Sequence, residues 1–268
     1  MKSKSLLASL LICLISSPAS ATPPGKLVGW GDNTYGQTNV PAGNDFGAIA
    51  GGFAHSLALR SDGSLAGWGD NSYGQTNVPA GNDFVSIAAG DFHSLALTSD
   101  GSLAAWGSNQ FGQSNVPAGN DFVAIAAGGG HNLALKSDGS LTAWGWSVYG
   151  QTNVPAGNDF VAIAAGDFHN LALKSDGSLA HWGPGYPVSA GNNFVAIAAG
   201  YTYSLALTSD GSLAGWGGYV LPAGNDFVAI AAGSYHSLAI QVPEPASWTL
   251  IRIGLLVGAL ERRRRIRA

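Results

Sequence analysis

Short apolar runs recur along most of the chain, and each run alternates large with small residues. In one stretch the runs are Phe122–Ala127, 131–135 and 141–144. Alternation with a period of two predicts β-strands, and the pair Asp138-Gly139 between the second and third runs predicts a hairpin turn. Because both sides of these strands are apolar, one with large residues and one with small, we expect each sheet to be covered on both faces.

The same unit of three runs returns about six times. Its tryptophan recurs four times at intervals of 38 residues and once more after 34. Glycine fills 39 of the 268 positions, which suits short strands joined by tight turns. Repetition at a period of this length predicts a repeat architecture in which neighbouring units share one core. The repeated tryptophans are Trp30, Trp68, Trp106, Trp144, Trp182 and Trp216.

The two ends of this array complement each other. The last copy stops at 236–240, before any third strand, whereas the first copy begins at 25–31 with a close match to the third strand at 63–69. A ring needs such ends, because the first strand can complete the last sheet and cover its free edge. The sequence therefore predicts an all-β fold over residues 22–241. It is a six-bladed β-propeller with short, three-stranded blades, closed by pairing of the N-terminal strand with the last blade.

Two recurring segments resemble a known family. The patterns A-A-G-x-x-H-S-L-A-L and D-G-S-L-x-x-W-G recur between residues 25 and 241 and resemble the regulator of chromosome condensation repeat. That resemblance implies a propeller, although the eukaryotic members have seven longer blades. The founder of the family is a nucleotide exchange factor, and that activity is a distant alternative for this chain. The short blades are also similar to secreted bacterial propellers that inhibit β-lactamases and bind through one face.

The first 21 residues have the pattern of a signal peptide. Lys2 and Lys4 precede an apolar stretch at 6–15, and Ala19-Ser20-Ala21 is a cleavage motif for signal peptidase. The mature chain would begin at Thr22. The single cysteine, Cys13, lies in the apolar stretch, so the mature chain would contain neither a disulfide nor a thiol nucleophile.

The C-terminal segment, residues 242–268, resembles the PEP-CTERM sorting signal of Gram-negative bacteria. Pro243, Glu244 and Pro245 precede an apolar run at 248–260 and an arginine cluster at 262–265. The resemblance implies processing by an exosortase, transient membrane association, and a final place at the cell surface, outer envelope or extracellular matrix. Exosortase substrates as a family accompany exopolysaccharide and biofilm production. An uncleaved tail anchor and a decayed signal are the alternatives, because the apolar run is shorter than the ~20 residues that span a bilayer.

Charge excludes one class of partner. Between residues 22 and 247 the chain has four Lys and Arg against fifteen Asp and Glu, a net charge of −11. Nucleic-acid binding depends on basic side chains that neutralise phosphates. We therefore expect no nucleic-acid partner.

One repeat position contains histidine in five of six copies, with Tyr203 in the fifth. A ring of metal ligands is one hypothesis, but it needs each histidine nitrogen within about 2.1 Å of one ion, and five backbones spread around a ring do not converge that far. We expect instead that each histidine is a core residue bonded to a neighbouring loop, and we predict neither a metal nor a cofactor. The histidines are His55, His93, His131, His169 and His236.

The repeated aspartates of N-D-F and S-D-G suit turn chemistry, with calcium binding as an alternative. The sequence has no G-x-S-x-G elbow and no phosphate-binding loop that ends in Gly-Lys-Ser/Thr. A hydrolase would need a unique carboxylate pair in one cleft. The prediction is therefore a protein that is not an enzyme.

Binding specificity must come from positions where the copies differ. Just before the histidine the copies vary and supply aromatic and acidic residues, which suit sugar stacking or protein contacts, or else plug the middle of the ring. The candidate binding face is Phe53, Asp91, Phe92, Asp167, Phe168, Tyr201 and Tyr235. A secondary candidate set, where the repeat is irregular, is Trp146, His181, Tyr186 and Tyr219. The loop aromatics Tyr35, Tyr73, Phe111 and Tyr149 are assigned a structural role.

Two functions fit these features. The first is an exported, surface-processed, non-catalytic binding or scaffold propeller linked to exopolysaccharide or biofilm matrix. The alternative is a protein-binding inhibitor or regulator of a secreted enzyme. The ligand, glycan or protein, is left open by the sequence.

Overall fold

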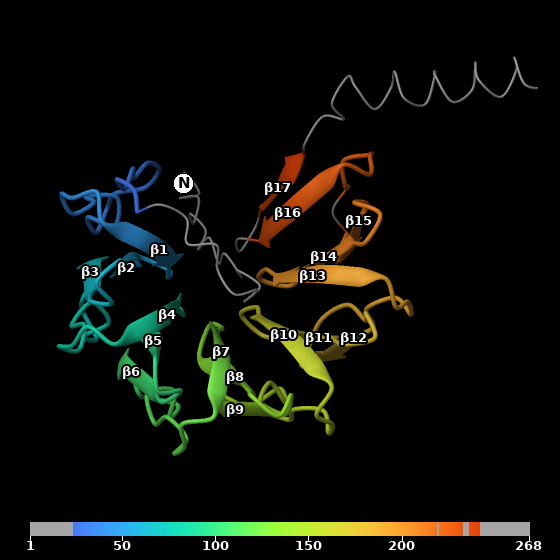
Figure 1. Ribbon diagram of the computed structural model, residues 1–268, viewed down its shortest axis with the longest axis horizontal. Coiled ribbons are helices and arrows are strands. Elements are labelled where there is room, and N and C mark those ends of the chain that lie inside the picture. Colours follow the sequence, from blue (N-terminus) through green and yellow to red (C-terminus); the bar gives the residue numbers. More distant parts are fainter. Residues whose placement is uncertain (1–23, 219, 233–235, 242–268) are drawn as a thin grey trace, which may run out of the picture.

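Residues 24–218, 220–232 and 236–241 are described by the computed structural model of the chain. Within these ranges all regular structure is β-strand, arranged in six antiparallel sheets. Figure 1 shows the sheets set around a centre as blades, with the first strand of each blade nearest the middle. The fold is thus a six-bladed propeller of three-stranded blades, as predicted, except that the last sheet has two strands.

The strands follow the chain in blade order. Blade one contains β1 (Phe46–Gly51), β2 (His55–Arg60) and β3 (Leu65–Gly69), and blade two contains β4 (Phe84–Ala89), β5 (His93–Thr98) and β6 (Leu103–Gly107). Blade three contains β7 (Phe122–Ala127), β8 (His131–Lys136) and β9 (Leu141–Gly145), and blade four contains β10 (Phe160–Ala165), β11 (Asn170–Lys174) and β12 (Leu179–Trp182). Blade five contains β13 (Phe194–Ala199), β14 (Ser204–Thr208) and β15 (Leu213–Trp216), and blade six contains β16 (Phe227–Ala232) and β17 (Ser237–Gln241).

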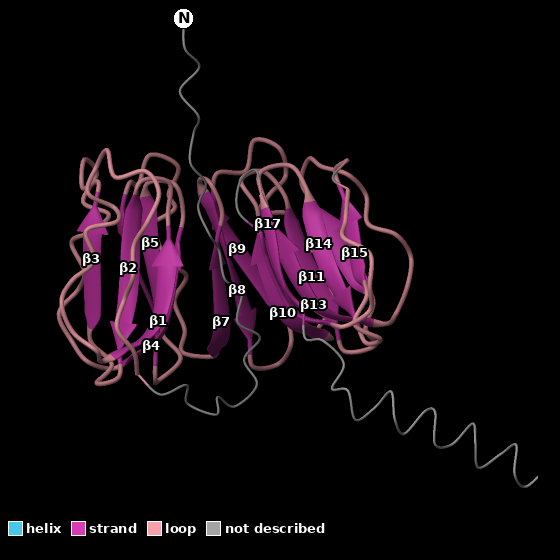
Figure 2. Cartoon of the chain, turned by 90° about the horizontal axis from the view of Figure 1, so that it is seen from above, coloured by secondary structure: helices cyan, strands magenta, loops and turns pink. Residues whose placement is uncertain are grey.

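The predicted strands and hairpins are confirmed. The runs at 131–135 and 141–144 agree with β8 and β9 to within one residue. Between them, Gly139 has a φ of 82° and donates its backbone N–H to the Lys136 carbonyl. That left-handed conformation is the reason for glycine after aspartate in the turn. Figure 2 shows the resulting sheets side by side, with loops at both ends.

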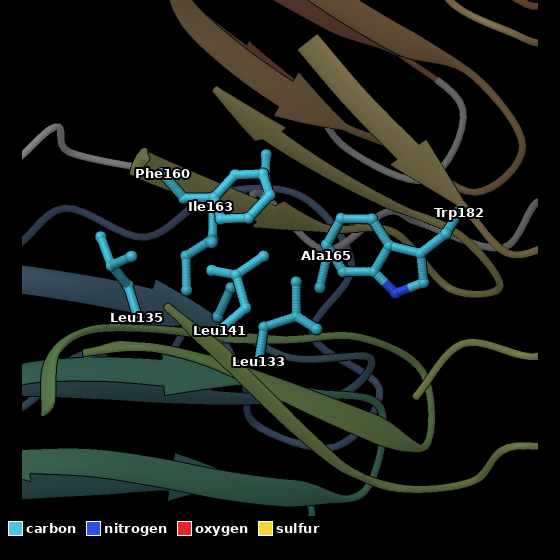
Figure 3. Close-up of a cluster of buried hydrophobic side chains, with 9 residues drawn as sticks. Leu133, Leu135, Leu141, Phe160, Ile163, Ala165 and Trp182 are labelled. Carbon is cyan, nitrogen blue, oxygen red and sulfur yellow. The ribbon is translucent and has the colours of Figure 1, made fainter. Parts of the chain in front are cut away.

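The hydrophobic core lies between blades rather than inside one. In the cluster drawn in Figure 3, Leu133, Leu135 and Leu141 of blade three face Phe160 and Ile163 of blade four. Burial of such side chains contributes about 1.5–3 kcal/mol each. The expectation that both faces of each sheet are covered is therefore met by stacking of neighbouring blades.

The repeated histidine joins one blade to the next. His131 Nε2 lies 2.7 Å from Asn170 Oδ1, and Asn170 Nδ2 donates to the Gln151 carbonyl at 2.9 Å. Because the amide nitrogen is used in that second bond, the histidine Nε2 is the donor in the first. Burial lowers the pKa of His131 to about 4, so the ring is neutral. The predicted core role is confirmed for His55, His93, His131 and His169, with a strand residue between the histidine and the loop, whereas His236 is exposed.

Glycine precedes each of these histidines by three positions, where neighbouring blades approach most closely. A Cβ built on Gly128 would lie 2.4 Å from the Gly166 carbonyl oxygen and 2.4 Å from His131 Cε1. The same collision recurs at Gly90 and Gly166. The spacing A-A-G-x-x-H is therefore required by the contact between blades.

The structure differs from the prediction at the joint of the ring, the place where the segment 25–31 was expected to meet β17 of the last blade. Within the described residues β17 pairs with β16 alone, so the predicted pairing of the N-terminal strand with the last blade is not formed. Gly25 and Phe46 exchange backbone hydrogen bonds of 3.0 and 3.3 Å, which link the segment 25–31 to the first blade as Gly63 is linked to Phe84 of the second. Pairing would need the two backbones within about 4.9 Å. Figure 1 shows β1 and β17 apart on the two sides of the joint.

Both halves of that joint are exposed. Trp30 has 81% of its surface exposed, and Leu238 and Ile240 have 52% and 60%. Their counterparts in blade five, Leu205 and Leu207, have 3% and 5%. Leu205 and Leu207 are buried because they pack against Phe227 and Ile230 of the next blade. No buried cluster of the described residues joins β17 to blade one in the same way, and Ile49 of β1 is likewise exposed.

Amide hydrogen exchange should show this free edge. We expect the outward-pointing amides of β17 to exchange at least 100-fold faster than the matching amides of β14, which has a partner on both sides. Mass spectrometry or NMR of the domain 22–241 measures the difference. Equal protection of β17 and β14 would contradict the open joint.

Several predicted features lie outside the described residues. They are the signal peptide, the sorting segment with Pro243, Glu244 and Pro245, and the candidate site residues Tyr219 and Tyr235. Among the residues that are described, no helix is long and apolar enough to cross a membrane.

Candidate functional site

A pocket of about 290 Å³ opens at one end of the ring, over blades two, three and four. Its walls come from the turns between first and second strands and from the loops that follow third strands, which meet at the same end because the strands are antiparallel. The turn residues are Asp91, Phe92, Gly129, Gly130, Asp167 and Phe168. The loop residues are Tyr73, Ser108, Gln110, Phe111, Gln113 and Trp146.

The pocket exists because the third copy departs from its neighbours. Copies two and four have Asp-Phe before the histidine, whereas copy three has Gly129-Gly130. A Cβ on Gly129 would lie 3.2 Å from Asp91 Oδ2, and one on Gly130 would lie 3.3 Å from Trp146 Cβ. The two glycines therefore leave room for the side chains of the blades on either side.

Aromatic rings form two walls of this site. On one side Phe92 lies 5.6 Å from Phe53 and 5.4 Å from Tyr73, measured between ring centroids. On the other, Trp146 contacts three rings at 5.4–5.6 Å and is stacked on one of them, Phe111. The remaining two are Tyr149 and Phe168, and Phe168 also contacts Tyr201 at 5.1 Å. Phe111 keeps 51% of its surface exposed, so the wall is accessible to a ligand.

Trp146 occupies its place at the expense of a hydrogen bond. In the preceding copies Gln75 Nε2 donates to Asp70 at 2.9 Å, and Gln113 Nε2 donates to Ser108 at 3.3 Å. Trp146 stands at the same repeat position and offers no acceptor. Gln151 is fully buried, and its Nε2 has no partner within the described ranges. An unpaired buried donor costs about 1–3 kcal/mol.

Asp91 and Asp167 both line the pocket, and both approach Gly129. Burial, together with the nearby charge of Asp167, raises the pKa of Asp91 to about 7. Burial alone raises the pKa of Asp167 to about 6. Neither has a salt bridge to a basic side chain in the described part of the chain. Their ionised forms are therefore disfavoured, since each is desolvated without a counter-charge.

The other repeated aspartates hold turns, as predicted. Asp62 Oδ1 accepts hydrogen bonds from Ser64 N at 2.9 Å and Ser64 Oγ at 2.7 Å, and these bonds lower the pKa of Asp62. In three copies the aspartate before the first phenylalanine of the blade pairs instead with a basic residue, as Asp121 does with Lys136 at 3.1 Å. Across the described ranges, no three His, Cys, Asp or Glu side chains form a group that could hold a metal.

The structure brings together most of the predicted binding face. Asp91, Phe92, Asp167 and Phe168 line the pocket, and Phe53 and Tyr201 extend its aromatic walls. Of the secondary set, Trp146 joins the same pocket. His181 and Tyr186 do not: the His181 ring lies 5.5 Å from buried His169, and neither residue lines the pocket.

Three loop aromatics that the sequence analysis assigned to structure belong to this site. Tyr73 and Phe111 line the pocket, and Tyr149 packs against Trp146. The signal that identifies them is topological. In an antiparallel blade the loop after the third strand returns to the end at which the first turn lies, so the loop aromatics share a face with the variable turns.

Comparisons with known proteins agree with this architecture. The model of the regulator of chromosome condensation (RCC1) repeat matches residues 48–75, 84–113, 122–151, 160–183 and 194–218, just over half of the chain. No curated protein sequence matches. The chain is similar to the solved CRINKLY WD40 ectodomain of the Arabidopsis thaliana receptor kinase ACR4, with a TM-score of 0.67 and 21% identity, over 89% of this chain and 100% of that one.

Two further structures are similar over part of their length. The ectodomain of the Physcomitrella patens receptor kinase CR4 has a TM-score of 0.60 and 31% identity, over 73% of this chain and 57% of that chain. Prp20p of Saccharomyces cerevisiae has a TM-score of 0.56 and 23% identity, over 64% and 57%. The chain therefore spans little more than half of the moss and yeast chains.

Proposed function

Because this chain belongs to the family of regulator of chromosome condensation (RCC1) repeat proteins, whose propellers generally bind or regulate other molecules, we propose that it is a non-catalytic binding propeller. Its ligand docks in the pocket over blades two, three and four. We propose that the ligand is a protein. The yeast neighbour Prp20p is described with protein partners, Gsp1p and histones for one structure and Kap60 for a second, and this precedent supports a protein ligand.

One observation carries the proposal. Gly129, Gly130 and Trp146 stand where the neighbouring copies have other residues, and the tryptophan leaves the buried Gln151 amide unpaired. A substitution that opens a pocket and removes a hydrogen bond does nothing for stability. Such a departure from the rules that favour folding is typical of a binding site.

The carboxylates support binding rather than hydrolysis. Many acid–base pairs have two environments that push the pKa values apart, so that one group is protonated while the other is ionised. Here burial raises the pKa of both Asp91 and Asp167. The two groups have similar surroundings, so we assign them one shared role in recognition.

We further propose that the protein works outside the cytoplasm. The motif Ala19-Ser20-Ala21 and the sequence Pro243-Glu244-Pro245 support export by signal peptidase and sorting by an exosortase, to a surface or matrix where exopolysaccharide is made. Its partner would then be a surface or secreted protein, and regulation of a secreted enzyme is one form of that function. Failure to find the protein in envelope and secreted fractions would contradict this placement.

A capture experiment tests the binding pocket. The domain 22–241 is immobilised and exposed to the envelope and secreted fractions of its own culture, in parallel with the variant Phe92→Ala/Phe168→Ala. We expect the unchanged domain to retain one protein and the double variant to lose at least 90% of it, because these two rings form opposite walls of the pocket.

The matched control is Tyr35→Ala. Tyr35 occupies the repeat position of Tyr73 and Phe111 and is similarly exposed, but it does not line the pocket. It should retain the partner in full. If Tyr35→Ala lost as much of the partner as the double variant, or if the double variant retained all of it, the pocket would not be the binding site. Retention of a polysaccharide instead of a protein would contradict the protein ligand.

A further inference from the structure

The pocket contains two carboxyl groups whose ionised forms the protein itself does not neutralise. The basic residues of the described chain are Lys26, Arg60, Lys136 and Lys174. The last three are already paired, with Asp45, Asp121 and Asp159. In the described chain no basic side chain forms a salt bridge with Asp91 or Asp167. A counter-charge for their ionised forms must therefore come from another molecule.

A neutral ligand would not remove the repulsion between the two ionised carboxylates. Sugar hydroxyls can donate hydrogen bonds to a carboxylate, but they leave two like charges facing each other in a partly desolvated site. A cation between the carboxylates attracts both and replaces their repulsion by two charge-assisted hydrogen bonds. Of the common ligand groups, a cation is therefore the one that suits this pair best.

The walls suit a planar cation. Rings from both sides border the pocket, including Phe92, Phe111 and Trp146. A guanidinium group stacks on aromatic faces and presents a fork of donors to carboxylates, whereas an ammonium is a compact, strongly hydrated charge. The volume of about 290 Å³ lies at the lower end of the range for small-molecule sites, which fits one side chain better than a length of polysaccharide.

We propose that the pocket receives an arginine side chain of the partner protein, with its guanidinium between Asp91 and Asp167 and its plane against the aromatic walls. This rests on the proposed binding function and names the group that the site recognises. The acidic surface of the domain, with a net charge of −11 between residues 22 and 247, would also steer a basic partner segment toward it.

A single-residue probe tests the proposal without knowledge of the partner. The domain is titrated with N-acetyl-arginine methylamide and with the matching citrulline compound, which has the same shape without the charge, and binding is followed by NMR or calorimetry. We expect millimolar binding of the arginine probe and at least tenfold weaker binding of the citrulline probe. Binding should weaken at least tenfold between pH 8 and pH 5, as the two carboxylates take up protons.

Two double variants separate the pocket from general charge effects. Asp91→Asn/Asp167→Asn should abolish arginine binding and its pH dependence. Asp138→Asn/Asp176→Asn removes the same charge from exposed hairpin turns and should change the affinity less than twofold. Equal binding of arginine and citrulline, or equal loss in both double variants, would overturn the inference. The capture test with Phe92→Ala/Phe168→Ala is independent of this outcome. Failure of the arginine probe would therefore contradict the arginine inference but not the proposed binding function of the pocket.

Discussion

Replacing Gly128 with alanine is expected to destabilise the domain by about 3 kcal/mol or more, which corresponds to a fall in Tm of roughly 6–12 °C. The added Cβ would lie 2.4 Å from the Gly166 carbonyl oxygen of the next blade and 2.4 Å from the buried His131 ring. Backbone cannot rotate out of the way as a side chain can. The clash must therefore separate two blades that share a core. Thermal or urea unfolding of the domain measures the loss.

Gly47→Ala is the matched control. Gly47 is in the first strand of blade one, whereas Gly128 directly follows β7. The nearest atom to a Cβ added at Gly47 is the Leu59 carbonyl oxygen at 4.0 Å, and the other copies have valine at this position. Its stability should stay within about 1 kcal/mol of the unchanged domain, or rise slightly. Similar stability for Gly128→Ala and Gly47→Ala would mean that blades are not packed through this glycine position.

The repeat allowed most of the fold to be predicted. Alternation of Leu133 and Leu135 with alanine predicts strands with two apolar faces, and the Asp-Gly pairs mark where the hairpins turn. These are local signals, and six copies repeat them. The contact between Asn170 and His131 could not be predicted, because it depends on how one blade is offset against the next.

The contact between the first and last blades was harder to predict from the sequence, for a different reason. The sequence match between 25–31 and 63–69 indicates which strand the segment resembles, and the Gly25–Phe46 bridge confirms its seat against the first blade. Whether it also reaches β17 depends on the sum of all blade-to-blade rotations. A small change at each interface accumulates around the ring, and no local pattern records that sum.

The candidate site was predicted in part. Differences between copies identified Asp91, Phe92 and Trp146 as separate candidates. Their meeting in one pocket follows from three-dimensional features, namely the missing side chains of Gly129 and Gly130 and the loops that return to the same end. The unpaired amide of Gln151 could not be inferred at all without the buried geometry.

Trp146→Ser is expected to separate function from stability. Serine is what the preceding copy has at this position, where Ser108 accepts a hydrogen bond from Gln113. The variant should offer the same acceptor to the Gln151 amide, and that gain of about 1 kcal/mol offsets lost ring contacts. Binding should fall at least 30-fold, since Trp146 contacts three other rings at the centre of the aromatic wall.

Trp144, two residues earlier, provides the contrast. Its Nε1–H donates to the Gln113 carbonyl at 3.0 Å, and its ring packs against the clusters between blades. Trp144→Ser should cost about 3–5 kcal/mol. The decisive measurement compares unfolding free energy and partner affinity for these two tryptophan variants side by side. We expect the Trp146→Ser domain to keep its stability within about 1 kcal/mol and to lose binding, whereas the Trp144→Ser domain loses stability. A Trp146→Ser domain that is strongly destabilised yet binds its partner with full affinity would contradict it.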